Sequence, residues 1–272
     1  MKVKVKVKVK KYLEIVKISF KNQLAWRFDV VMNIVFTVAR ILFAYLLWGA
    51  IFGQRDMVAG FTFSSMLSYY IVNSFLTQMD KSHTVSEELQ DRIRNGTFSK
   101  YMIIPVRVEG YFMAQAVGKT AFYGVFTLIA AVAGAFLFGI RFVFTQSPPM
   151  LAAAAALAVL GFIFLIQLNF FLGILTFRYE DIWLFLMIKS NLIAFITGAM
   201  VPLSLLPEGV LGVMRYFPFY YIGYLPSMLV IGQNAGEAGI GLLVLTGWVV
   251  FFGIINPLLY KQIRTRYDGV GI

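Results

Sequence analysis

The tripeptide Gly118-Lys119-Thr120 has the letters that end a phosphate-binding loop, in which the lysine reaches the phosphates and the hydroxyl holds Mg²⁺. That loop needs another glycine five residues before its second glycine, and Met113 occupies this place. The segment also lies in an apolar, helix-like stretch rather than after a strand. We therefore predict no nucleotide site here, and any energy source must be a different polypeptide.

Acid–base, thiol and metal chemistry have few candidate residues. Glu180 and Asp181 are adjacent carboxylates, but no histidine is near them, so stabilisation of a helix N-terminus is favoured over general acid–base catalysis. His83 is the single histidine and cysteine is absent. The sequence thus excludes a multi-histidine metal site, disulfides and thiol nucleophiles, and no metal site is predicted.

Two cations fall inside long apolar stretches. Arg40 lies about 18 Å along the first of these stretches at 1.5 Å per residue, and Lys189 lies about a third of the way into the fifth. A charge deep in hydrocarbon usually faces the bundle interior or a wet cavity. These cations, with Asn169 and Asn191, are predicted to line a path for an anionic or amphiphilic substrate. Structural pairing with amides such as Asn169 is the alternative.

The composition places these residues in a membrane. The chain has 272 residues, of which 60% are hydrophobic and 14% charged, and its mean hydropathy is +0.78. A soluble domain carries about 25% charged residues, and so much apolar surface exceeds what one soluble core of this size hides. The formal charge is +11. Membrane topology explains the distribution of the basic residues better than nucleic-acid binding does, so no nucleic-acid partner is predicted.

The apolar stretches predict an all-α membrane protein with six transmembrane helices in a single domain, residues 1–272. A span needs about 20 apolar residues. Before the last span, residues 201–235 contain several prolines, which predicts two re-entrant half-helices rather than one straight helix. The six predicted spans are Phe28–Phe52, Phe61–Gln78, Tyr111–Ile140, Met150–Phe177, Ile182–Leu205 and Gly239–Tyr260.

The Lys and Arg distribution orients the chain in the cytoplasmic membrane. The segments on one side carry nearly all of these residues, whereas the other side has Arg55, Arg141 and Arg215; both termini are therefore predicted to be cytoplasmic. Residues 1–27 are predicted to comprise a disordered basic Lys-Val tail beside anionic headgroups and then an amphipathic interfacial helix from Tyr12 to Arg27.

The cytoplasmic loop at residues 80–110 is the most polar internal region. Thr84 and Glu87 have capping-box spacing, which predicts a helix over Val85–Arg94 that Gly96 ends. Such a helix, with charged and exposed apolar groups, is suited to docking in a groove of a soluble partner; an ordinary solvated loop helix is the alternative. The residues predicted to couple to that partner are Glu87, Leu89, Asp91, Arg92, Ile93 and Phe98.

Three stretches, in order, resemble the membrane-spanning permease of ABC-2-type (type V) ABC exporters. They are the basic entry KISFKNQLAWRFDVVMNIVF, the loop EELQDRIRNGTFSKYMIIPV, which is similar to the family's coupling helix, and the proline-rich GAMVPLSLLPEGVLGVMRYFPFYYIGYLPSMLVIG. With the helix count, the resemblance covers nearly the whole chain.

The resemblance implies a transport subunit that is not itself an enzyme. Two permeases, identical or related, would form the translocation pathway as a dimer, and two separate ABC ATPase subunits, which bind the ATP and Mg²⁺, would dock on the coupling helices. This chain would then need no cofactor of its own. An ion-gradient-driven secondary transporter is the alternative, although it usually shows buried acids, and no acid lies deep in a predicted span. The substrate stays open.

Overall fold

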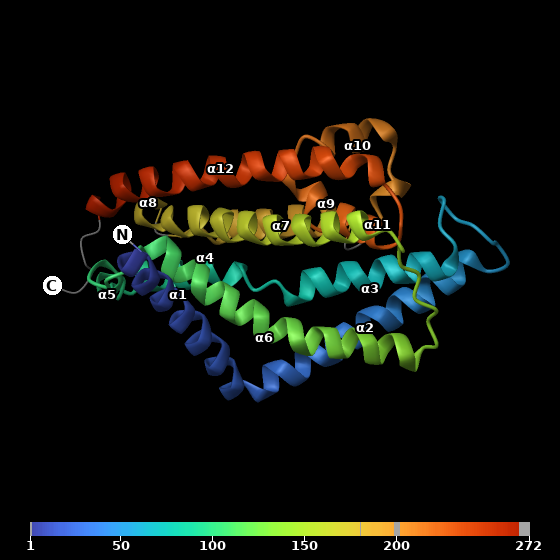
Figure 1. Cartoon of the computed structure of the whole chain (residues 1–272), viewed down its shortest axis with the longest axis horizontal. Coiled ribbons are helices and arrows are strands. Elements are labelled where there is room, and N and C mark those ends of the chain that lie inside the picture. The colour runs from blue at the N-terminus through green and yellow to red at the C-terminus, as the bar shows by residue number, and fades with distance from the viewer. Residues whose placement is uncertain (1, 180, 199–201, 267–272) are drawn as a thin grey trace.

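The computed structural model describes residues 2–179, 181–198 and 202–266, and its elements are helices (Figure 1). Apart from short 3-10 turns, the helices are α1 Lys2–Asn22, α2 Arg27–Phe52, α3 Phe63–Met79, α4 His83–Arg94, α5 Ser99–Met102, α6 Val108–Leu137, α7 Pro148–Ile174, α8 Thr176–Tyr179, α9 Trp183–Ile196, α10 Glu208–Met214, α11 Tyr224–Val230 and α12 Ala238–Ile263. The prediction of an all-α fold is confirmed.

Four segments of the described chain are long and apolar enough to cross a membrane: Arg27–Phe52, Val108–Leu137, Pro148–Tyr179 and Ala235–Ile263. They match four of the six predicted spans within a few residues. The other two predicted spans correspond to α3, with 17 residues, and α9, with 14, which are short for a crossing of about 20 residues. The chain is thus an all-α membrane protein, and the count of six stays a prediction.

Helix α9 is shorter than the sequence predicts, because α3 supplies caps for its C-terminal end. Asn73 Nδ2 donates to the Thr197 carbonyl at 2.9 Å, and the Tyr69 hydroxyl donates to the Gly198 carbonyl at 3.0 Å. These donors satisfy carbonyls that would otherwise need a further helical turn, and Gly198 adopts a positive φ of 71°. Of the predicted Ile182–Leu205 span, residues 199–201 lie outside the described residues.

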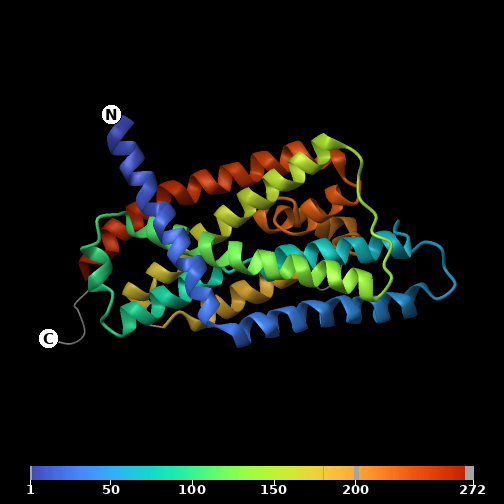
Figure 2. The same ribbon diagram turned by 60° about the horizontal axis from the view of Figure 1, so that its bottom comes forward.

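The N-terminus differs more from expectation. The predicted disordered tail is wrong where the structure describes it, because α1 runs as one helix from Lys2 to Asn22. Extending an existing helix adds one hydrogen bond per residue without a new nucleus. The predicted interfacial helix is its second half, which ends at Asn22 and is followed by a 3-10 turn, Gln23–Ala25. The chain then turns into α2 (Figure 2).

Helix α1 lies across α6 and packs tightly on it (Figure 2). The ring of Phe20 meets Phe122 edge to face at 5.2 Å. Gly118 allows the backbones to approach, since a Cβ there would lie 2.8 Å from Ser19 Cβ and would also meet the Val16 carbonyl oxygen. The α1–α6 contact therefore depends on Gly118, the first residue of the Gly-Lys-Thr tripeptide.

The largest apolar core lies where α7, α11 and α12 meet. The proline-rich segment forms two short helices, α10 and α11, at the end of the bundle opposite α5 (Figure 1). In α11, Leu225 and Leu229 are fully buried, and Pro226 lies in the first turn, where its missing N–H does no harm. The expected break in this segment is seen, whereas its re-entry into the membrane stays a prediction; residue 201 lies outside the described residues.

The contact at Gly118 can be tested by Gly118→Ala. We expect α1 to be displaced and the melting temperature to fall, with a destabilisation of about 1–3 kcal/mol from overpacking. Gly124→Ala in the same helix is the matched control, because its Cβ would meet Met79 at an ordinary 3.9 Å. Thermal unfolding of both variants in one detergent measures the difference; equal melting temperatures would contradict a tight α1–α6 contact.

Candidate functional site

Helix α4 uses its apolar face to pack on α7. Leu89 and Phe98 are completely buried, and Ile93 is 6% exposed. A Cβ on Gly173 of α7 would lie 2.8 Å from Leu89 Cβ, so the two helices are in direct contact there. The expectation that these three apolar side chains are exposed for a partner is wrong. Helix α7 covers the apolar face of α4, and Phe98, which precedes α5, packs on Phe177 and Tyr260 of the same chain.

The N-terminus of α4 is capped differently from the prediction. The helix begins at His83 rather than Val85, and the Ser82 backbone N–H and hydroxyl both donate to the Asp80 carboxylate, at 2.8 and 3.0 Å. Thr84 instead donates to the Lys81 carbonyl, so the predicted capping box is wrong. The predicted stop is confirmed: Gly96 has φ 68° and its N–H donates to the Ile93 carbonyl.

The charged predicted coupling residues lie on the outer side of α4. Glu87 and Asp91 are exposed, and the side chain of Arg92 is 39% exposed, 3.9 Å from Glu88. A contact of this length made by a partly exposed arginine contributes little to stability. These three residues are therefore free to meet another protein, and their role in coupling stays a prediction.

Glu88, for which the sequence predicted no role, joins α4 to α5 and α6. Its carboxylate accepts hydrogen bonds from Gln115 Nε2 at 2.8 Å and from the Tyr101 hydroxyl at 3.1 Å, and Lys119 Nζ lies 3.6 Å away. Burial and the nearby Glu88 raise the pKa of the Tyr101 hydroxyl. Bonds to a charged, half-buried group are stronger than neutral ones, so Glu88 fixes α4 in place.

A second set of contacts joins α4 to α9. Asp181 lies just before α9 and accepts the Trp183 backbone N–H, at the first residue of the helix, at 2.8 Å. The same carboxylate oxygen accepts Gln90 Nε2 at 3.1 Å, and Arg94 lies 3.8 Å from the carboxylate. Asp181 thus supports the predicted helix-terminus role. Glu180 lies outside the described residues.

Asn169 of α7 is the centre of a buried hydrogen-bond network. Its Oδ1 accepts from Lys189 Nζ at 2.6 Å and from the Ser86 hydroxyl at 3.1 Å. Its Nδ2 donates to the Ser82 hydroxyl at 3.0 Å and to the Leu165 carbonyl at 2.8 Å. The structural pairing considered for Lys189 is therefore present, and it connects α9, α7 and α4.

Three of the four predicted pathway residues meet in one place. Arg40, Asn169 and Lys189 line a cavity of about 280 Å³ between α2, α3, α7 and α9. Asn191 is exposed and does not line it. The residues are far apart in sequence, so their meeting follows from the helix packing; that they form a pathway stays a prediction.

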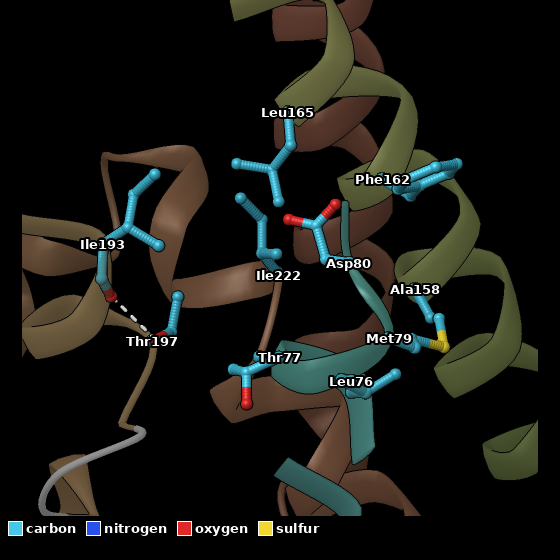
Figure 3. A pocket seen from close by; sticks show the side chains of 11 residues that line it. Leu76, Thr77, Met79, Asp80, Ala158, Phe162, Leu165, Ile193, Thr197 and Ile222 are labelled. Carbon is cyan, nitrogen blue, oxygen red and sulfur yellow. Dashed lines mark hydrogen bonds between the residues drawn. The ribbon is translucent and has the colours of Figure 1, made fainter. Parts of the chain in front are cut away.

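Sequence reasoning missed two cavity residues, Asp80 and Lys81, which connect α3 to α4. Burial raises the pKa of the Asp80 carboxyl despite hydrogen bonds from Ser82, and burial lowers the pKa of the Lys81 amine. Asp80 also borders a neighbouring apolar cavity, near Leu165 and Ile222 (Figure 3). A charged pair directly after a predicted span was the signal that would have found them.

At the opposite end of the bundle, Glu237 joins the proline-rich segment to α12. Its carboxylate accepts hydrogen bonds from Arg215 at 3.2 Å, from the Tyr220 hydroxyl at 2.7 Å and from Asn234 at 3.1 Å. Glu208 lies 3.8 Å from Arg215. This cluster fixes α10 to the start of α12.

Comparison with known families decides the class of this chain. The model of a family described as "ABC-2 family transporter protein" matches residues 38–271. The chain belongs to the ABC-2 transporter family. No curated protein matches it at the similarity required.

The resemblance of the sequence to ABC-2-type permeases is thereby confirmed. This ABC-2 permease is the membrane component of a transporter rather than a catalytic chain, and its family implies association with an ABC ATPase and a membrane. In agreement, Gly118-Lys119-Thr120 lies inside α6, where Lys119 contacts Glu88 and Thr120 Oγ1 accepts the Lys81 N–H at 3.1 Å. These residues have packing roles in the permease.

The Glu88 contacts can be tested by Glu88→Ala. Loss of charged hydrogen bonds to Gln115 and Tyr101 is expected to destabilise the permease by about 1.5–3 kcal/mol. Glu14→Ala is the matched control, because the Glu14–Lys17 pair is exposed and worth about 0.3–0.5 kcal/mol. Thermal unfolding in detergent compares the two variants. If the Glu88→Ala variant is as stable as the control, Glu88 does not hold α4 in place.

Proposed function

We propose that the chain is the membrane-spanning permease subunit of an ATP-driven ABC exporter. It works as a dimer with an identical or related permease and couples to two separate ABC ATPase subunits, which bind ATP and Mg²⁺. It crosses the cytoplasmic membrane six times with both termini in the cytoplasm. The family match over residues 38–271 supports the transporter class, and the contacts of α4 support the coupling.

The observation that carries the coupling is the double connection of α4 to α9. One connection runs from Ser86 through Asn169 to Lys189, and the other runs from Gln90 to Asp181 at the start of α9. A force applied to the exposed charged side of α4 by an ATPase would therefore move α9 and the cavity that α9 lines. Glu87, Asp91 and Arg92 are the proposed contact residues.

The surface of α9 supports a second permease. This apolar helix, Trp183–Ile196, has no buried side chain, so in the assembly lipid or another chain must cover it. A partner permease against α9 would place the cavities of both copies next to a common pathway. Arg40, Lys189 and Asn169 would line it within each chain, and Asn191 would reach it from the exposed side of α9.

The proposed orientation rests on charge and on the fold. The start of α1, the end of α12 and α5 lie at one end of the bundle (Figure 1). The same end carries most of the Lys and Arg residues, whereas the other carries Arg55, Arg141 and Arg215. Positive residues remain on the cytoplasmic side during insertion, so this end is proposed to meet the ATPases.

The assembly is tested by gentle purification from the native membrane followed by mass spectrometry. We expect a stoichiometric ABC ATPase, and one or two permease species distinguish a homodimer from a heterodimer. If no ATPase co-purifies and ATP does not change transport in reconstituted vesicles, the exporter proposal is wrong. A gradient-driven carrier then replaces it.

The coupling surface is tested by charge reversal in Arg92→Glu. We expect export and the stimulation of ATP hydrolysis to be lost, with little change in melting temperature, because the Arg92 side chain is 39% exposed and its 3.9 Å contact with Glu88 is weak. Asp91→Lys should act in the same way. Arg55→Glu, which changes the same charge in a loop between α2 and α3, is the control and should keep both activities. Unchanged stimulation in the two α4 variants would remove α4 from the ATPase interface.

A further inference from the structure

The charges around the 280 Å³ cavity are unbalanced. Arg40, Lys81 and Lys189 line it, and its acidic lining residue is Asp80. Among the described residues, none of the three cations forms an ion pair with an acid within 4.0 Å, although other surface cations of the chain do. Asp29 acts electrostatically on Lys81 and Glu87 on Lys189, but neither acid lines the cavity. The lining itself thus has three cations and one acid, and a bound anion relieves the repulsion among the cations.

Lys81 and Lys189 are held in place by neutral groups, which leaves their charge available. Lys189 Nζ donates to Asn169 Oδ1 at 2.6 Å, which uses one of its three N–H donors. The Lys81 ammonium lies over the Tyr123 ring, 4.2 Å from its centre, and a ring face attracts a cation without neutralising it. The site is therefore organised before any ligand arrives.

An apolar cavity of about 100 Å³ adjoins the cationic one, and Figure 3 shows the side chains that line the apolar cavity. The two share five lining residues, so they are continuous: Thr77, Asp80, Leu165, Ile193 and Thr197. The rest of the smaller cavity is mainly apolar, with Leu76, Ala158, Phe162 and Ile222 among its lining residues. A charged compartment beside an apolar one matches a molecule with an anionic head and a hydrocarbon tail.

The dimensions limit the size of that molecule. Sites for drug-sized ligands enclose about 300–1,000 Å³, and the cationic cavity lies just below this range. It has room for a single phosphate, sulfate or carboxylate with its water, whereas a folded peptide or a polysaccharide chain needs far more. In the single chain, the neighbouring α9 has no buried side chain, so a ligand can reach the cavity along the surface of α9.

We propose that these two cavities form a binding site for an anionic single-chain amphiphile, whose head contacts Arg40, Lys81 and Lys189 and whose first tail carbons occupy the apolar cavity. The proposal names the substrate class of the exporter and to that extent rests on the proposed function. Binding itself does not require an ATPase and can be measured on this chain alone.

The experiment uses the full chain in phosphatidylcholine nanodiscs and follows the melting temperature against ligand concentration. Dodecyl phosphate is expected to stabilise the protein more strongly than inorganic phosphate, and dodecyltrimethylammonium is expected not to stabilise it. Equal effects of the two dodecyl compounds would overturn the anionic site. Equal apparent affinities for dodecyl phosphate and inorganic phosphate would overturn the role of the apolar cavity.

Variants locate the site. Lys81→Gln and Lys189→Gln should each weaken dodecyl phosphate binding about tenfold, the equivalent of one lost charge-assisted hydrogen bond. Lys189→Arg should retain binding, and Arg55→Gln, which removes the same charge outside the cavity, should not change it. Ala158→Leu should weaken dodecyl phosphate binding and leave inorganic phosphate unaffected. Unchanged affinity in both lysine-to-glutamine variants would overturn the proposal.

The outcomes separate this site from the exporter assignment. If dodecyl phosphate binds but no ATPase co-purifies, the exporter proposal is wrong and the proposed amphiphile site stands. If an ABC ATPase co-purifies but dodecyl phosphate changes neither ATP hydrolysis nor the melting temperature, the proposed amphiphile site is wrong and the exporter proposal stands.

Discussion

The carboxamide of Asn169 is the contact on which the inner half of the molecule depends. An amide can accept and donate at once, and here it accepts from α9 and α4 while it donates to Ser82 and to its own helix. A carboxylate at this place could not donate, and an apolar side chain would leave the Lys189 ammonium unpartnered in a half-buried site. Coupling helix and cavity are thus parts of one network.

Long apolar runs made α2, α6, α7 and α12 predictable, because about 20 consecutive apolar residues have one stable solution in lipid. The end of α9 was not predictable, since its caps are Asn73 and Tyr69, which are more than 120 residues away in the chain. Local patterns do not contain such contacts.

The site residues, like the helices, were predictable only where a local sequence pattern marks them. Charge in an apolar run identified Arg40 and Lys189 without any structure, because charge in hydrocarbon is rare. The apolar face of α4 was found as a pattern but assigned to the wrong partner, since periodicity reports that a face is buried and not what buries it. Glu88 gave no signal, because its role arises from its contact with Gln115 on α6.

The packing of α1 on α6 also has a consequence for biosynthesis. The Tyr12 hydroxyl accepts a hydrogen bond from the Arg107 N–H, 95 residues later in the chain, so the docking surface does not exist when α1 leaves the ribosome. At about 5–20 residues per second, α1 waits roughly 5–20 s for its partner. During this interval its basic, amphipathic sequence can hold it on the membrane surface, so α1 joins the bundle only after α2 and α3 have been synthesised.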